Sequence, residues 1–275
     1  MRALEFLLGG IRPGETVLTL GGEGSTHVLA TATHARRLGA ATVAVRWPHD
    51  MSPLAQRVAR LASERATILR RRTVAGAFLT VLRLRLTGRY RFVPLGGSSP
   101  LGVLGHVGSA LELAEQVRAG VLPLPARVVV PLGSGGTAAG LALGFALAEL
   151  PTTVIGARVG PRVAVNRVRV GRLLRATAAL VARHAGAPLP PALLARAMSP
   201  EHFRIVHDVY GGAYGRPLAA GDRAAAILLP RGLALDATYS AKGCAAAIAL
   251  AAEPGRTLFW LTFDGRELLD RGEHP

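Results

Sequence analysis

Cysteine and lysine are almost absent from this chain of 275 residues. Cys244 is the only cysteine, so no intrachain disulfide can form, and this usage indicates a reducing, cytoplasmic location. Lys242 is the only lysine, and the other basic residues are all arginine. Chemistry that needs a side-chain amine therefore has one candidate in this sequence.

Acidic residues are also scarce, with 17 Asp and Glu against 33 Lys and Arg, which gives a formal net charge of +16. A basic excess of this size is typical of nucleic-acid-binding proteins. The arginines are scattered, however, with their tightest clusters at 70–72 and 83–91, and aromatic residues make up only 5% of the chain. We therefore expect weak adhesion to polyanions but no specific nucleic-acid partner.

Long apolar runs are missing as well. The longest uncharged segment covers residues 128–148, and Pro131 and a glycine loop divide it into pieces too short to span a bilayer. Residues 1–8 make a poor signal peptide because Glu5 interrupts a short apolar stretch. We expect no membrane partner.

Apolar strands and helical segments alternate along the chain. We expect strands at 16–20, 41–47, 66–69, 90–95, 127–132, 152–157 and 257–262. We expect helices at 26–38, 53–65, 75–86, 104–118, 163–184, 222–229 and 241–252, with another from the glycine loop to 150, and irregular structure at 188–216. This alternation predicts an α/β protein built on parallel sheets. A proline-punctuated stretch at 120–125 indicates a boundary between domains 1–118 and 119–275.

The most informative stretch is the loop that follows the apolar run at 128–132. It contains Gly133, Ser134, Gly135, Gly136 and Thr137, and an Ala/Leu-rich helix begins there. Glycines let the backbone approach a ligand, and the free N–H groups of a helix start favour an anion. The loop predicts a site for a cofactor phosphate, although an ordinary glycine-rich turn has the same local pattern.

A second loop has similar features. Ser25 and Thr26 stand at the start of the helix expected at 26–38, after Gly21, Gly22 and Gly24. This helix start suits a substrate carboxylate, although a plain N-cap would need the same residues. Since ligands of open α/β sheets lie at the carboxyl ends of strands, the two loops together predict one cofactor phosphate and one amino-acid carboxylate.

Six short motifs add a family resemblance. They read RALEFLL at 2–8, GGEGSTH at 21–27, PLGGSSPLG at 94–102, GSGGTAAG at 133–140, YGRP at 214–217 and LDATYSAK at 235–242. In this order they resemble the fold-type-II pyridoxal-phosphate enzymes of the D-cysteine desulfhydrase and 1-aminocyclopropane-1-carboxylate deaminase family. The resemblance implies two open, twisted parallel-sheet domains of the tryptophan synthase β-like fold, a small amino-acid substrate, and a homodimer.

The resemblance also implies roles for individual residues. Gly133, Ser134, Gly135, Gly136 and Thr137 would cradle the phosphate of pyridoxal phosphate. Ser25, Thr26 and His27 would face the substrate carboxylate, with Thr26 replacing an asparagine that contacts the cofactor ring. Tyr214 and Tyr239 would be acid/base or orienting groups at the reacting carbon, although either tyrosine can instead be a buried packing residue. Ser25 joins the two tyrosines among the catalytic candidates.

Ser240 would lie against the pyridine nitrogen of the cofactor. The family's deaminases have a carboxylate there, whereas its desulfhydrases have a neutral group. A serine therefore favours β-elimination from D-cysteine or a related amino acid, which yields pyruvate, ammonia and sulfide.

One family residue has no counterpart. The lysine that holds the cofactor as an imine precedes the motif RKLE, and alignment with residues 2–5 puts it just before Met1. Lys242 matches a different lysine of the family. We expect an N-terminally shortened form of a working enzyme, and two alternatives stay open: a member that binds the cofactor without imine chemistry, and a takeover by Lys242.

Rival classes are less well supported. No histidine pair has the i, i+4 spacing of a helical zinc site, and no nucleophile elbow precedes suitable partners for a serine hydrolase. A noncatalytic cofactor-binding or scaffolding protein is the alternative from another class.

Overall fold

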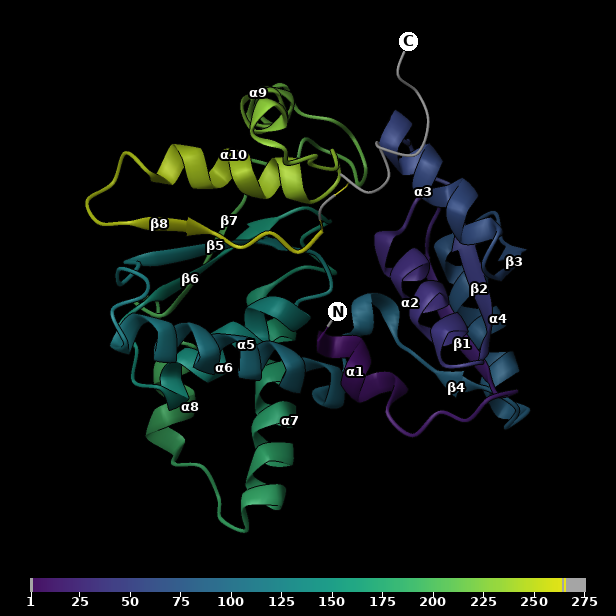
Figure 1. Cartoon of the computed structure of the whole chain (residues 1–275), viewed down its shortest axis with the longest axis horizontal. Helices are drawn as coiled ribbons and strands as arrows, with labels where there is room; N and C mark the ends of the chain where they lie inside the picture. Colours follow the sequence, from purple (N-terminus) through teal and green to yellow (C-terminus); the bar gives the residue numbers. More distant parts are fainter. Residues whose placement is uncertain (1, 264, 266–275) are drawn as a thin grey trace.

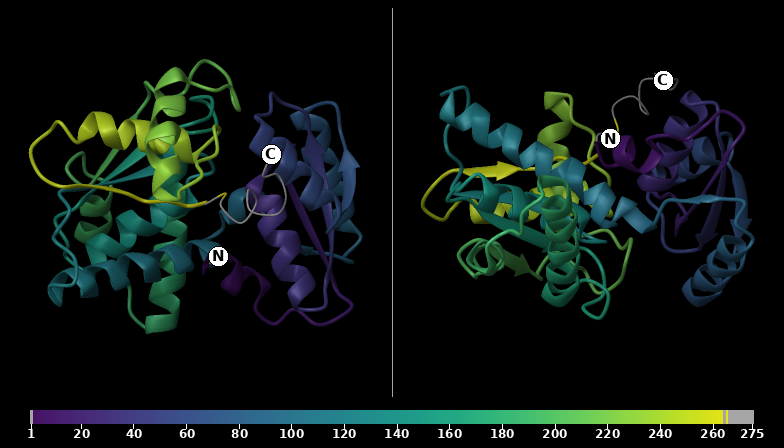
Figure 2. Two further views of the ribbon diagram at one scale, coloured as in Figure 1. Left: turned by 45° about the horizontal axis from the view of Figure 1, so that its top comes forward. Right: turned by 90° about the horizontal axis from the view of Figure 1, so that it is seen from below.

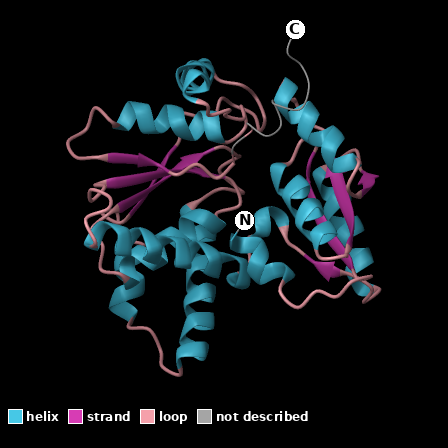
Figure 3. Ribbon diagram, in the orientation of Figure 1, coloured by secondary structure: helices cyan, strands magenta, loops and turns pink. Residues whose placement is uncertain are grey.

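The computed structural model describes residues 2–263 and 265, which form two lobes, each built on a four-stranded parallel sheet (Figure 1). Helices cover both faces of each sheet (Figure 3). This architecture confirms the predicted α/β class with two open parallel sheets.

The first sheet has the strand order β3-β2-β1-β4. Its strands are β1 (Thr16–Gly22), β2 (Ala41–Trp47), β3 (Thr67–Arg70) and β4 (Arg91–Phe92). Helices α2 (Thr26–Arg37) and α3 (Pro53–Ser63) pack on one face, and α4 (Val74–Leu86) packs on the other. The central strand β1 is buried at every position after Thr16, as expected for a parallel strand that is covered on both faces.

The second sheet has the order β7-β6-β5-β8. Its strands are β5 (Arg127–Leu132), β6 (Thr153–Arg158), β7 (Phe203–Val206) and β8 (Thr257–Phe259). One face carries α5 (Pro100–Arg118), α6 (Gly136–Leu147), α7 (Arg167–Ala185) and α8 (Pro191–Ala197). The other face carries α9 (Ala219–Leu228) and α10 (Ser240–Leu250).

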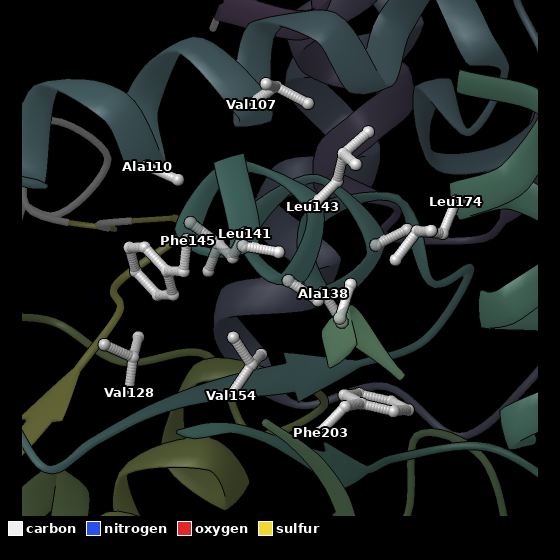
Figure 4. Close-up of a cluster of buried hydrophobic side chains, with 14 of the residues drawn as sticks. Val107, Ala110, Val128, Ala138, Leu141, Leu143, Phe145, Val154, Leu174 and Phe203 are labelled. Carbon is white, nitrogen blue, oxygen red and sulfur yellow. The ribbon is translucent and has the colours of Figure 1, made fainter. Parts of the chain in front are cut away.

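The largest core lies around α6, which is buried on nearly all sides (Figure 4). Helix α5 packs so closely on α6 that a Cβ added at Gly144 would lie 2.5 Å from the Cβ of Ala110. The packing therefore joins α5 to the second sheet, and the division at residues 118 and 119 stays a prediction. In the part of the chain that the structure describes, no helix is long and apolar enough to cross a membrane.

The expectation of irregular structure at 188–216 was wrong for α8 and β7, which are short elements within that range. Leu193 and Leu194 of α8 pack against the large core, a long-range contact that local pattern does not reveal. Three helices begin three or four residues from the expected position: α5 begins four residues earlier, where Ser99 caps it, α9 begins three residues earlier at Ala219, and α7 begins four residues later, after the cap residue Asn166.

Helix α1 (Arg2–Leu8) lies at the junction of the two lobes, as both views of Figure 2 show. Leu4, Leu7 and Leu8 pack with Val17 of the first sheet. The backbone of Arg2 faces α5, since a Cβ added at Gly105 would lie 2.5 Å from the Arg2 carbonyl carbon. The start of α1 thus contacts the helix that covers α6.

Candidate functional site

Loops from both lobes meet at the carboxyl ends of β1 and β5. The first lobe contributes Gly24, Thr26 and His49 to a narrow pocket, and the second lobe contributes Tyr214 and Tyr239. Leu54, Ala55, Val58, Asp236 and Thr238 complete its lining. The pocket lies where an open α/β sheet is expected to bind its ligand.

The glycine loop after β5 has the geometry of an anion cradle. Gly135 is the N-cap residue of α6 with a left-handed φ of 95°, a conformation that favours glycine. A Cβ added at Gly136 would lie 2.7 Å from Ser98 Oγ, and one added at Gly133 would lie 3.0 Å from the Tyr239 ring. Glycines are therefore needed here, and they leave backbone N–H groups at the helix start for a phosphate.

Ser98 belongs to this loop in space, although the sequence analysis assigned it no role. Its hydroxyl donates to Ser134 Oγ at 2.7 Å and accepts from the Gly136 N–H at 3.2 Å. Arg169 of α7 adds a positive charge, since its Nε donates to the Ser134 carbonyl at 3.2 Å. Ser98 lies in the motif at 94–102, which was a detectable signal, whereas Arg169 had none.

Thr137 is the hydroxyl residue on the first turn of α6. Its Oγ1 lies 3.5 Å from His106 Nε2 on α5. Burial lowers the pKa of His106 to about 4, so this imidazole is neutral at physiological pH. The histidine therefore orients Thr137 without adding a charge to the loop.

The loop at residues 21–27, which the sequence predicted to face the substrate carboxylate, lies only partly at the pocket. Ser25 caps α2, with its Oγ accepting from the Val28 N–H at 3.4 Å, and Thr26 lines the pocket. The His27 ring is directed elsewhere: Nε2 lies 3.0 Å from Thr19 Oγ1, and the ring also donates to the Pro94 carbonyl. Burial lowers its pKa to about 4. The predicted carboxylate contact of His27 has no support from its ring position.

The two predicted tyrosines do meet. The hydroxyl groups of Tyr214 and Tyr239 form a hydrogen bond, and the Tyr214 ring packs edge-on against His49 with centroids 4.9 Å apart. Burial raises the pKa of both tyrosines, that of Tyr239 well above its ordinary value. Both hydroxyls therefore keep their protons at neutral pH and are suited to donate them.

Ser240 directly follows Tyr239 in the sequence and is completely buried. Its hydroxyl donates to Asp236 Oδ2 at 2.6 Å and accepts from the Asp236 N–H at 2.7 Å. The Asp236 carboxylate also accepts from the backbone N–H groups of Thr238 and Tyr239. The sequence analysis quoted Asp236 within a motif but gave it no role.

Lys242 is outside the pocket lining. Its Nζ donates to the Tyr210 carbonyl at 2.8 Å, and the residue is completely buried. Burial lowers its pKa, and the negative charge of Asp236 partly offsets that effect. The structure therefore gives Lys242 a backbone partner.

Two parallel-sheet lobes with a glycine-rich helix start near their junction define an α/β protein with a candidate anion site. The family model described as "Pyridoxal-phosphate dependent enzyme" matches residues 1–262, and the chain belongs to this family. It is 38% identical to nocardicin C-9' epimerase of Nocardia uniformis subsp. tsuyamanensis, across 97% of this chain and 81% of that protein. It is 33% identical to D-cysteine desulfhydrase of Salmonella choleraesuis (strain SC-B67), across 90% and 75%.

Solved structures agree on the fold. An ACC deaminase homologue superimposes with a TM-score of 0.73 at 22% identity, covering 98% of this chain and 82% of that one. The T.th. threonine deaminase superimposes with a TM-score of 0.61 at 22% identity, covering 100% and 83%. At these identities the likeness establishes the fold-type-II architecture alone.

Proposed function

We propose that the protein is a pyridoxal-phosphate-dependent lyase that catalyses β-elimination from D-cysteine or a related small amino acid. The observation that carries this proposal is the protonated pair Tyr214 and Tyr239, which lies beside the glycine cradle and lines the pocket with Thr26. The similarity to D-cysteine desulfhydrase supports the same reaction.

The glycine cradle fits the phosphate of this cofactor. Gly133, Ser134, Gly135, Gly136 and Thr137 would hold the phosphate through backbone N–H groups and hydroxyls. Thr26 would lie beside the cofactor ring, and Ser240 near its pyridine nitrogen. When bound, pyridoxal phosphate supplies an electron sink for negative charge at the substrate α-carbon.

The tyrosine pair would donate a proton to the sulfur atom of the leaving group. Cysteine and water give pyruvate, ammonia and hydrogen sulfide: the Cα–H and Cβ–S bonds break, a proton passes to sulfur, and water then hydrolyses the Cα–N bond of the released imine. Because burial raises the pKa of both tyrosines, both hydroxyls are protonated at neutral pH, and we assign them the role of proton donor rather than of base. Tyr239 is the donor closest to the cradle, since its ring lies against Gly133.

We propose that the amine that binds the cofactor covalently comes from a residue other than Lys242, because the Lys242 Nζ donates to the Tyr210 carbonyl. The family motif puts a lysine just before Met1. The backbone of Arg2 packs against Gly105, and the next residue, His106, contacts Thr137 at the cradle. We propose that the family's imine-forming lysine would approach the cradle from this side.

Epimerisation is the second candidate. The relative with 38% identity is an epimerase, and a protonated tyrosine beside the α-carbon can return a proton to it. A noncatalytic cofactor-binding protein is the third candidate, because Lys242, the only lysine of the sequence, donates to a backbone carbonyl outside the pocket lining. Both candidates share the cradle and differ from the lyase in their products.

The deciding experiment compares the chain with a version extended by Asn-Lys before Met1. Each protein is incubated with pyridoxal phosphate and then with D-cysteine or L-cysteine, and sulfide, pyruvate and optical rotation are followed. We expect the extended protein to release equal amounts of sulfide and pyruvate from D-cysteine. Loss of optical rotation without sulfide would favour the epimerase, and cofactor binding without either change would favour the noncatalytic protein.

A further inference from the structure

Lys242 lies on the first turn of α10 and reaches the segment 207–217, which connects β7 to α9. Its Nζ donates to the Tyr210 carbonyl at 2.8 Å, and a Cβ added at Gly211 would lie 3.7 Å from the same nitrogen. The side chain has no exposed surface. Burial of an ammonium group costs desolvation free energy. The one described hydrogen bond of the Lys242 Nζ therefore contributes to offsetting that cost.

The same helix start holds this segment at a second point. Tyr239 is the N-cap residue of α10, three positions before Lys242, and its hydroxyl meets that of Tyr214. Lys242 holds Tyr210, four positions before Tyr214. The first turn of α10 and its cap residue therefore contact the segment at Tyr210 and at Tyr214. Residues 211–213 lie between these two contacts.

The segment itself has little stiffness between these points. Gly211 and Gly212, which lie between them, have left-handed φ values of 73° and 85°, and Gly215, directly after Tyr214, has one of 80°. Glycines lose more conformational freedom on folding than other residues, so their order depends on external contacts. The placement of Tyr214 therefore depends on what fixes the segment on either side.

Arg158 at the end of β6 fixes the base of the segment. Its guanidinium lies 4.4 Å from the Tyr210 ring centroid, and its Nε donates to His207 Nδ1 at 2.8 Å. Arg158 thus holds the Tyr210 side chain while Lys242 holds its carbonyl. Tyr210 is the fixed point from which the chain runs to Tyr214.

We propose that Lys242 is a positioning residue, which holds the segment 210–215 so that the Tyr214 hydroxyl stays against Tyr239. The catalytic consequence rests on the proposed function, whereas the ordering of the segment does not. The contact with Tyr210 directs the amine away from the pocket lining. Lys242 therefore acts through Tyr214 and forms no covalent link to a cofactor.

Hydrogen exchange tests the ordering directly, in the protein with and without pyridoxal phosphate. In Lys242→Met we expect amides of 209–216 to exchange about tenfold faster or more, because the segment loses a charged hydrogen bond. Lys242→Gln keeps a hydrogen-bond donor, so we expect a smaller increase in the exchange rate at 209–216. This variant replaces Lys242→Met in the experiment if the methionine variant does not fold.

Arg127→Met is the matched control, because Arg127 is another buried cation in this lobe that donates to backbone carbonyls, those of Leu250 and Gly255. We expect it to raise exchange near 250–257 and to leave 209–216 unchanged. Exchange at 209–216 within twofold of wild type in Lys242→Met, or the same pattern in both variants, overturns the proposal.

Kinetics and labelling supply independent readouts. In the extended enzyme we expect Lys242→Met to lower kcat more than it changes KM, and to cause no further loss in a Tyr214→Phe background. Full additivity of the two substitutions overturns the proposal. Borohydride reduction after treatment with pyridoxal phosphate also overturns it if peptide mass analysis finds the cofactor on Lys242. If the protein does not catalyse the lyase reaction, the hydrogen-exchange result alone decides whether Lys242 orders the segment 210–215.

Discussion

The hydroxyl of Ser240 donates a 2.6 Å hydrogen bond to the carboxylate of Asp236. The sequence alone presents Ser240 as a neutral group at the expected position of the pyridine nitrogen. The structure adds a carboxylate behind it, so the serine proton is directed toward Asp236. The local electrostatics at Ser240 are therefore set by two residues.

Asp236→Asn should lower the free energy of unfolding by about 1–3 kcal/mol. The carboxylate accepts from Thr238, Tyr239 and Ser240, and an amide cannot accept at both of its terminal atoms. Urea unfolding measures the change, with Asp222→Asn on α9 as a control. An unfolding midpoint equal to that of wild type would show that the carboxylate is dispensable.

His27 predicts a pH dependence of stability. Its pKa is about 4 in the folded protein and near 6.5 in the unfolded chain, so between these values only the unfolded state binds the proton. Stability should fall as pH drops from 6.5 to 4, and His27 alone contributes a loss of about 3 kcal/mol by the lower limit.

Urea unfolding of wild type and His27→Gln between pH 8 and pH 4 isolates this contribution, because other titrating groups are common to both proteins. The variant should lose less stability over the window. Parallel curves would mean that the His27 ring is not buried as the structure has it.

The sequence predicted the α/β class and the central strands because buried parallel strands are continuous apolar runs. Residues 41–47 were predicted to the residue, whereas β4 and β8 at the sheet edges are shorter than expected, since edge pairing depends on neighbours distant in sequence. Element α8 was missed for the same reason: its apolar residues pack on a core formed mainly by other segments.

Gly136→Ala should weaken cofactor binding about tenfold or more, because its Cβ would displace Ser98 from the cradle. Gly108→Ala on α5 is the matched control, since an added Cβ there meets nothing within 4 Å. The control should leave binding unchanged and raise stability by about 0.5–1 kcal/mol. Fluorescence titration with pyridoxal phosphate measures both affinities. Equal affinities would place the phosphate elsewhere.

Tyr239→Phe in the extended enzyme should lower kcat about a hundredfold or more, with a smaller change in KM, because the leaving group loses its proton donor. Tyr90→Phe, in the first lobe outside the pocket lining, should retain the wild-type rate. Steady-state release of sulfide from D-cysteine is the measurement. Retention of more than half of the rate in Tyr239→Phe would remove the tyrosine from the mechanism.

The sequence singled out the glycine loop and the two tyrosines because these residues lie in contiguous motifs, and the structure brings the tyrosine hydroxyls together. It did not reveal the positions of His49, Ser98 and Asp236, whose contacts depend on how separate loops meet. It also failed for the His27 ring, which points to Thr19, because a helix-start motif does not specify side-chain direction. The expected homodimer and cytoplasmic location stay predictions.

The central claim is that the glycine loop after β5 binds the phosphate of pyridoxal phosphate. Calorimetric titration of the chain with deoxypyridoxine phosphate and with deoxypyridoxine tests it directly, because neither ligand has an aldehyde and no lysine is needed. We predict that the phosphorylated ligand binds about tenfold tighter or more, and that Gly136→Ala abolishes the difference. Equal affinity of wild type for the two ligands would contradict the account.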